Sequence, residues 1–208
     1  MHTQTLNRQQ YIDSTMQMSH LATLEFAKQA LDWWDDYYSW ERDPCLVLYE
    51  GEEAICYLFY HISKNSDYLT IHNIFTPHNH RFHGYASKIL QILFDDKVSY
   101  HTIERVKLYS VSSSIEFYLK LGLDFWGVNE IGQYYSDFPM PKNLADIPNQ
   151  MQHPHLERLL PKRLDNIYAK LQKNGGDFKG KELVIFNDAK ELMQERYRFD
   201  EFKIASGH

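Results

Sequence analysis

Residues 68–88 constrain the fold of this chain more than any other stretch. They begin as a run rich in β-branched and aromatic residues that extends to Thr76, and Pro77 and a polar loop then break this run. An amphipathic helix follows, entered through Arg81 and Gly84. A helix N-terminus offers unpaired N–H groups and a partial positive charge, and a glycine beside it lets a ligand approach the main chain. The pattern therefore predicts a strand, a loop and a helix start that bind a phosphate or pyrophosphate.

The composition fits a globular protein. With 208 residues and 43% hydrophobic content, the chain is long enough for one domain with an appendage. It shows no N-terminal basic-then-apolar segment and no apolar run near the roughly 18 residues needed to span a bilayer. We therefore expect a cytoplasmic protein without a membrane partner. A net charge of −6 and the lack of a Lys/Arg-dense run argue against nucleic-acid binding.

The two cysteines, Cys45 and Cys56, lie in apolar β-like runs on either side of Glu50-Gly51. If that dipeptide forms a two-residue turn, the cysteines face one another and a disulfide is geometrically conceivable. Reduced core cysteines are the favoured interpretation for a cytosolic protein.

The first half of the chain predicts a short strand over residues 3–6 and then an amphipathic helix that ends near Tyr38. Apolar residues at steps of three and four define the face of this helix. They are Leu21, Leu24, Ala27, Leu31 and Trp34. The end of the helix mixes aromatic rings with Asp35 and Asp36. This end is either a core-facing aromatic stripe beside a solvated acidic face, or a rim that recognises a cationic acceptor.

Three antiparallel strands are predicted next, over residues 45–49, 54–63 and 68–76. A helix should then run to about Lys97, followed by a strand over residues 106–110. Ser113 and Glu116 have capping-box spacing, and Gly122 stands where a C-terminal cap belongs, so a helix is predicted over residues 114–121. Residues 124–129 and 133–138 read as two final strands.

This order of elements predicts an α/β (α+β) fold, with a mixed, mostly antiparallel sheet flanked by helices. We expect one domain over residues 1–142 and a mainly helical extension over residues 143–208. Within the extension, residues 156–171 have helical spacing, residues 182–186 suggest a strand, and Asp188 opens a further helix. The extension packs back on the domain, closes over an acceptor site or forms a homodimer contact, and the sequence leaves these three alternatives open.

Two sequence blocks stand out together. The first is Arg81-x-x-Gly84-x-Ala86 at a helix start, and the second is IEFYLKLGL at residues 115–123. In their order and their elements they resemble the pyrophosphate-binding motif and the following helix of the GNAT superfamily of acyl-CoA-dependent N-acyltransferases. The chain departs from the usual pattern in a loop one residue longer and in Val111, where many members have asparagine.

The resemblance implies acetyl-CoA, or another acyl-CoA, as the acyl donor. The diphosphate would rest on the backbone at the helix start, and the pantetheine arm would lie along the end of the preceding strand. The residues that the resemblance assigns to the cofactor are Ile74, Phe75, Thr76, Arg81, Phe82, His83, Gly84, Tyr85, Ala86 and Ser87.

The resemblance also implies direct attack of an amine on the thioester. Tyr118 matches the family's tyrosine near the sulfur and would protonate the departing thiolate; otherwise it is a half-buried tyrosine with a satisfied hydroxyl. For the base we predict His72, expected to titrate near neutrality and to share a strand face with Thr70 and Ile74. The alternative is a sheet histidine bonded to a neighbour. Glu52, Glu53 and Asp67 are weaker candidates.

The loop also contains His78, His80 and His83, and this H-x-H-x-x-H spacing invites a metal interpretation. We expect no metal, because no carboxylate or cysteine completes the set and a metal would compete with the diphosphate. Polar loop residues are the favoured interpretation.

The sequence thus predicts an N-acetyltransferase that acts on a primary amine of a small molecule or a peptide. The rival hypothesis is a catalytically silent acyl-CoA-binding or protein-interaction module with the same fold.

Overall fold

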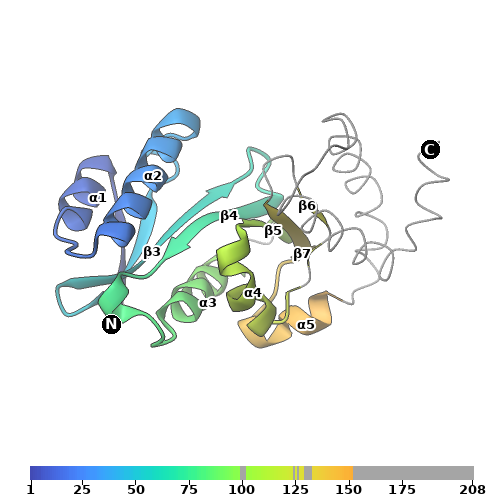
Figure 1. Cartoon of the computed structure of the whole chain (residues 1–208). Helices are drawn as coiled ribbons and strands as arrows, with labels where there is room; N and C mark the ends of the chain where they lie inside the picture. Colours follow the sequence, from blue (N-terminus) through green and yellow to red (C-terminus); the bar gives the residue numbers. More distant parts are fainter. Residues whose placement is uncertain (99–101, 124, 126, 129–132, 152–208) are drawn as a thin grey trace, which may run out of the picture. The chain divides into compact units, whose positions relative to one another are not determined.

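The computed structural model describes residues 1–98, 102–123, 125, 127–128 and 133–151 (Figure 1). The chain divides into two compact units, Met1–Ile103 and Glu104–His208, and each is described by itself. The elements predicted over residues 156–171 and 182–186 and from Asp188 onward lie outside the described residues. The proposed boundary after residue 142 therefore stays a prediction.

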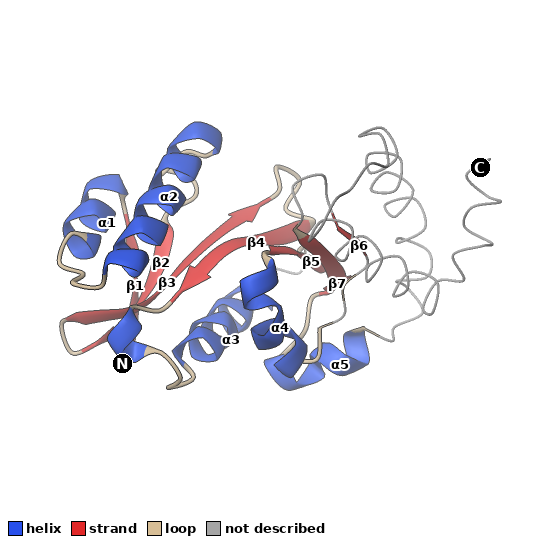
Figure 2. Ribbon diagram, viewed as in Figure 1, coloured by secondary structure: helices blue, strands red, loops and turns tan. Residues whose placement is uncertain are grey.

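Four antiparallel strands form the sheet of the first unit (Figure 2). They follow one another in chain order and confirm the predicted strands. Their bounds are β1 (His2–Leu6), β2 (Cys45–Glu50), β3 (Glu53–Ile62) and β4 (Tyr68–Phe75). Because Glu50 pairs with Glu53, the turn between β2 and β3 is Gly51-Glu52, with Gly51 at φ +61°.

This register decides the state of the cysteines. Cys56 lies opposite Leu48 on β2, whereas Cys45 pairs with Leu6 of β1. The two cysteines therefore do not face one another across the hairpin. Both are buried and free, as the interpretation of reduced core cysteines predicted.

Three helices cover the sheet of the first unit, α1 and α2 on one face and α3 on the other (Figures 1 and 2). Helix α2 (Leu21–Tyr37) and helix α3 (Tyr85–Val98) confirm the predicted helices. Helix α1 (Arg8–Thr15) was not predicted. It begins with a capping box, in which Asn7 and Gln10 each accept a hydrogen bond from the other's backbone N–H at 3.0 Å.

The buried face of α2 differs from the predicted stripe. Leu21 is exposed, and the residues that α2 buries are Thr23, Ala27, Ala30 and Trp34. These positions follow i, i+4, i+7 and i+11, so the true face is rotated relative to the leucine stripe. Small residues at this face let α2 approach an aromatic core.

Aromatic rings form the core between α1, α2 and the sheet. Tyr11 and Trp34 are fully buried and contact Phe59, with ring centroids 5.1 and 4.8 Å away. Their polar atoms are satisfied, because the Tyr11 hydroxyl donates to the Ala27 carbonyl and Trp34 Nε1 donates to the Asp43 carbonyl.

In the second unit, β7 (Tyr134–Pro139) pairs antiparallel with β5 (Arg105–Ser110) and with β6 (Gly127–Val128). The predicted strands are thus present, the one over residues 124–129 being described only at β6. Among the described residues of this unit, the remaining elements are two short 3₁₀ turns and two short helices. They are η2 (Ser112–Ser114), α4 (Ile115–Lys120), η3 (Leu144–Asp146) and α5 (Ile147–Gln150).

The start of α4 corrects the predicted capping box. Ser113 lies inside η2, and the N-cap residue is Ser114, whose side chain makes no capping hydrogen bond. The predicted C-terminal cap is confirmed, because Gly122 has φ +83° and its N–H donates to the Leu119 carbonyl. A Cβ at Gly122 would lie 2.4 Å from Pro148, so close packing also requires glycine.

The fold class is therefore as predicted, a mainly antiparallel sheet with flanking helices. Across the described part of the chain, no helix combines the length and the hydropathy that a bilayer crossing requires.

Candidate active site

The loop between β4 and α3 carries the predicted phosphate site. After the 3₁₀ turn η1 (His78–His80), Phe82 and Gly84 both adopt positive φ, at +67° and +77°. The Gly84 carbonyl accepts a hydrogen bond from Lys88 N–H at 3.0 Å, so the α3 ladder begins there. The N–H groups of the first turn have no intrahelical acceptor and offer themselves to an anion.

Gly84 has open space beside it, since nothing lies within 4 Å of the position a Cβ would take. Its φ therefore requires glycine, and the space is free for a ligand. Phe82 holds a positive φ without being glycine, and its side chain is fully exposed. Unfavourable backbone of this kind persists where the surroundings enforce it, and it clusters at ligand sites.

Local contacts brace the loop. The Arg81 Nε donates to the Thr76 carbonyl at 3.3 Å, and His83 Nδ1 lies 2.7 Å from the Arg81 carbonyl oxygen. The His83 ring stacks on Tyr85, with centroids 5.7 Å apart. The loop thus returns to the end of β4, so the structure brings the predicted cofactor residues 81–87 next to Thr76.

Acidic groups lie close to this site. The Tyr85 hydroxyl donates to Glu50 Oε2 at 3.3 Å. Desolvation, followed by the proximity of the Glu50 carboxylate and then of Glu53, raises the pKa of the tyrosine. Arg81 is exposed and supplies positive charge on the same loop. The helix start, Arg81 and the open Gly84 suit the binding of a diphosphate, whereas the negative charge of Glu50 disfavours it.

Phe75 does not line a cofactor channel with its side chain. Its ring stacks on Tyr57 at 4.8 Å and meets Phe26 of α2 edge-on, inside the buried core. The main chain of Phe75 is therefore the part that is available to a pantetheine arm, and the assignment of this residue to the cofactor stays a prediction. Ile74 and Thr76 are half-buried.

A β-bulge in β4 sets the direction of His72. Phe59 pairs with Asn73 and the next residue, Tyr60, pairs with Ile71, which leaves His72 as the extra residue. His72 and Phe75 both contact α2, although residues three positions apart in a regular strand point to opposite faces. The expected alternation is thus broken toward Ile74, because the bulge shifts the pleat by one residue. The face shared with Thr70 is retained, since Thr70 pairs with His61 and the rings of His61 and His72 both contact Tyr38.

His72 lies among aromatic rings. Its Nε2 is 2.9 Å from the Tyr38 hydroxyl, and its ring centroid is 4.9 Å from that of Trp33. Burial, with a smaller contribution from nearby His61, lowers the pKa of His72 to about 3. The expectation that His72 titrates near neutrality is therefore wrong, since its neighbours disfavour the charged imidazolium.

The aromatic end of α2 has one buried ring and two exposed rings, and its role in recognising an acceptor stays a prediction. Trp34 is buried, whereas Trp33 and Tyr37 are exposed. Asp35 is bound by Arg8, with both carboxylate oxygens within 2.9 Å of the Arg8 Nε. This hydrogen bond holds the pKa of Asp35 below its usual value. Asp35 is thus engaged within the protein, and the exposed rings remain as the surface of the rim.

The three loop histidines differ in their nearest partners. His78 stacks on His20 at 4.0 Å, His80 Nε2 lies 2.8 Å from Glu53 Oε1, and His83 contacts Arg81 and Tyr85. Their side chains therefore do not converge on one point.

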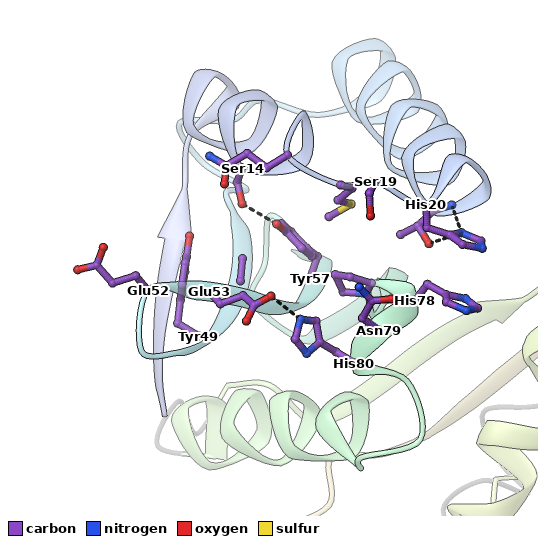
Figure 3. Close-up of a pocket in the computed structure, with 15 residues that line it drawn as sticks. Ser14, Ser19, His20, Tyr49, Glu52, Glu53, Tyr57, His78, Asn79 and His80 are labelled. Atoms are coloured by element: carbon purple, nitrogen blue, oxygen red, sulfur yellow. Dashed lines mark hydrogen bonds and ion pairs between the residues drawn. The ribbon is translucent and has the colours of Figure 1, made fainter.

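A cavity of about 320 Å³ lies against η1 on the face of the sheet that α1 covers (Figure 3). Sequence reasoning missed it. Ser14, Tyr49 and Tyr57 contribute hydroxyl groups to its wall. The capping box at Asn7 was the available signal, because it predicts α1 and so brings Ser14 over the hairpin.

Tyr118 belongs to the second unit. It is buried in α4, its ring centroid lies 5.0 Å from that of Phe117, and its carbonyl accepts from Leu123 N–H. Its role as proton donor stays a prediction.

Comparison with known proteins agrees with the motifs. Residues 15–123 match the model of a family described as "Acetyltransferase (GNAT) family". Among curated proteins, none matches the sequence.

Solved structures show the same fold at low sequence identity. An aminoglycoside 6'-N-acetyltransferase complexed with coenzyme A is 11% identical, with 68% of this chain and 98% of that chain covered and a TM-score of 0.51. An aminoglycoside 6'-acetyltransferase type Ii is 14% identical, with 68% and 98% covered and a TM-score of 0.51. A bacterial toxin is 13% identical, with 74% and 96% covered and a TM-score of 0.51.

Proposed function

Because the chain belongs to the acetyltransferase (GNAT) family, and is therefore an acyltransferase, we propose that it transfers an acetyl group from acetyl-CoA to a primary amine. The observation that carries the choice of donor is the start of α3. There, Phe82 and the open Gly84 both have positive φ, and the first-turn N–H groups lie beside an exposed Arg81. Such a site suits the diphosphate of coenzyme A.

The main chain of Ile74, Phe75 and Thr76 is proposed to hold the pantetheine arm, since an extended amide can pair with a strand as a peptide does. The helix start from Phe82 to Ser87 would hold the diphosphate. Acetyl-CoA supplies an activated thioester carbonyl.

In the proposed reaction the amine nitrogen forms the new C–N bond to the carbonyl carbon, and the C–S bond breaks. The thiolate takes one proton, for which we propose the Tyr118 phenol as donor. The nitrogen, which attacks as a neutral amine, loses one proton to solvent, and solvent returns one proton to the Tyr118 phenolate, so charge and atoms balance.

His72 is proposed to act as a neutral group. With a pKa of about 3, it is too weak a base to hold the proton of an ammonium ion at neutral pH. Paired with the Tyr38 hydroxyl at the bulge, it can still orient a water molecule or the acceptor. Bulges often lie next to active sites, because they redirect a side chain.

The acceptor is proposed to be a small amine. The exposed rings of Trp33 and Tyr37 can contact an ammonium group or the apolar part of an acceptor. Structural neighbours include aminoglycoside acetyltransferases, which supports an amine as the acceptor class.

Calorimetry with coenzyme A, followed by thiol-release assays with acetyl-CoA over a panel of amines, tests the proposal. We expect binding of coenzyme A and turnover with at least one amine. Binding of coenzyme A with no turnover on any amine would favour a silent acyl-CoA-binding module. Failure to bind any acyl-CoA would contradict both.

A further inference from the structure

The cavity of about 320 Å³ in the first unit has no role in the proposed transfer. Its described lining residues come mainly from the connection between α1 and α2, the β2–β3 hairpin and η1 (Figure 3). None of the residues described as lining it belongs to the 81–87 segment. We propose that this cavity binds a small ammonium compound that also carries hydroxyl groups, such as an amino sugar.

Hydroxyl groups make up one side of the cavity. Ser14 Oγ and the Tyr57 hydroxyl are hydrogen-bonded to each other, and Tyr49 stands beside them (Figure 3). Burial raises the pKa of both Tyr49 and Tyr57, so the phenols stay protonated and can donate as well as accept. Such a wall matches the hydroxyls of a polyol.

The positions of these hydroxyls are fixed by the core. The ring of Tyr57 is stacked on Phe75 and packed edge-on against Tyr11, with centroids 4.8 and 5.8 Å away. Tyr57 is almost fully buried, and its hydroxyl is hydrogen-bonded to Ser14, which also lines the cavity. Tyr49 is held by stacking on His2 at 5.3 Å. Polar groups positioned in advance reduce the entropy lost when a ligand binds.

Charge favours a cation over an anion. The residues described as lining the cavity include Glu52 and Glu53 but no lysine or arginine. Glu53 directs its carboxylate across the cavity toward His80, whereas the Glu52 carboxylate points away (Figure 3). Glu53 Oε1 is 2.8 Å from His80 Nε2, which anchors the carboxylate and leaves Oε2 for an ammonium group. Asn79 and Ser19 add neutral hydrogen-bonding groups.

The volume limits the ligand to a small molecule. It lies at the lower end of the range for small-molecule sites, about 300 to 1,000 Å³. A single pyranose ring matches that space better than an oligosaccharide or a folded partner. The site is separate from the proposed acyl-CoA site, since none of the residues described as lining it is among those assigned to the pantetheine arm or the diphosphate.

Isothermal titration of the full chain with glucosamine and with glucose, without acyl-CoA, tests the proposal. The two sugars differ only at C2, where glucosamine carries an ammonium group and glucose carries a hydroxyl group. We expect glucosamine to bind with a dissociation constant on the order of 1 mM, as its few atoms allow. Glucose should bind about five-fold more weakly, because a partly exposed carboxylate contributes modestly.

Glu53→Gln should remove the preference for glucosamine, and Glu52→Gln, which makes the same change in net charge one residue away, should retain it. Tyr57→Phe should weaken both sugars equally. Thermal melts establish that each variant is folded. Equal binding of the two sugars, an unchanged preference in Glu53→Gln, or no binding of glucosamine at about ten times the expected constant would overturn the proposal. Because these titrations contain no acyl-CoA, a negative result would contradict this sugar site alone. The proposed acyl transfer is tested separately by the thiol-release assay.

Discussion

His72 Nε2 and the Tyr38 hydroxyl lie 2.9 Å apart, at the one position where β4 carries an extra residue relative to β3. The contact joins the end of α2 to the β-bulge. It places an imidazole with a strongly lowered pKa beside the exposed aromatic rim. The chemistry of this histidine therefore follows from its neighbours and not from its ordinary titration.

Replacement of His72 by glutamine should make stability less dependent on pH. The pKa of His72 falls from 6.5 to about 3 on folding, so between these values the unfolded chain binds the extra proton. The wild-type free energy of unfolding must therefore decrease as the pH falls below 6.5. His72→Gln should lack this component, a difference of roughly 1 kcal/mol between pH 7 and pH 5.5. Urea unfolding at both pH values measures it, and parallel curves for the two proteins would refute the lowered pKa.

Gly84→Ala should weaken coenzyme A binding. Its φ of +77° disfavours a side chain, and the added methyl group would enter the space assigned to the diphosphate. Gly51→Ala is a matched control, because Gly51 has φ +61° and equally open surroundings at the β2–β3 turn. Both should lose about 1 kcal/mol of stability, but only Gly84→Ala should lose about ten-fold or more in affinity. Calorimetry that finds equal affinities for the two variants would contradict the assignment of the helix start.

Glu50→Gln should strengthen coenzyme A binding. The carboxylate accepts a hydrogen bond from Tyr85 and so lies near the proposed diphosphate site, where it repels the anion. Its removal should raise affinity about two- to three-fold at low salt and less at high salt. Glu25→Gln, an exposed change on α2, serves as the control for net charge. A weaker affinity in Glu50→Gln than in Glu25→Gln would show that the Tyr85 contact supports the site.

Tyr118→Phe should lower kcat with little change in the KM for acetyl-CoA, because only proton donation to the thiolate is lost. General acid catalysis contributes typically 10²- to 10⁴-fold, and water can replace part of it, so a loss of about 10- to 100-fold is expected. Tyr109→Phe, another tyrosine of the second unit, should leave kcat within about two-fold. Thermal melts separate a loss of folding from a loss of catalysis. A Tyr118→Phe enzyme with unchanged kcat would remove this residue from the mechanism.

Elements whose signals are local were predictable from the sequence. The break at Pro77, the glycine before α3 and the apolar spacing of Ile89, Leu90 and Leu93 act through backbone preference and through neighbours within one helical turn. The signal for helix α1 was equally local, since its capping box consists of Asn7 and Gln10. It was missed because few apolar residues mark its buried face.

Pairings between distant segments were beyond local reasoning. The side to which His72 points depends on a bulge, which only the register of β3 against β4 reveals. The side chain of Phe75 lies in the core, where its ring stacks on Tyr57 of the neighbouring strand, and this contact also depends on the pairing of β3 with β4. From the sequence, Asp35 is a candidate for ligand binding. In the structure its carboxylate is bound by Arg8, which lies 27 residues away in the chain.

By itself, the sequence thus determined the order of strands and helices, the glycine-bearing helix start and the likeness to one family. These depend on backbone propensity and on residues close in the chain. Only the tertiary structure decided that His72 is half-buried beside Tyr38, that Cys45 and Cys56 do not face one another, and that a hydroxyl-lined cavity forms beside η1. Burial, strand register and cavity shape arise from long-range packing, and packing is what sets the pKa and the accessibility of each group.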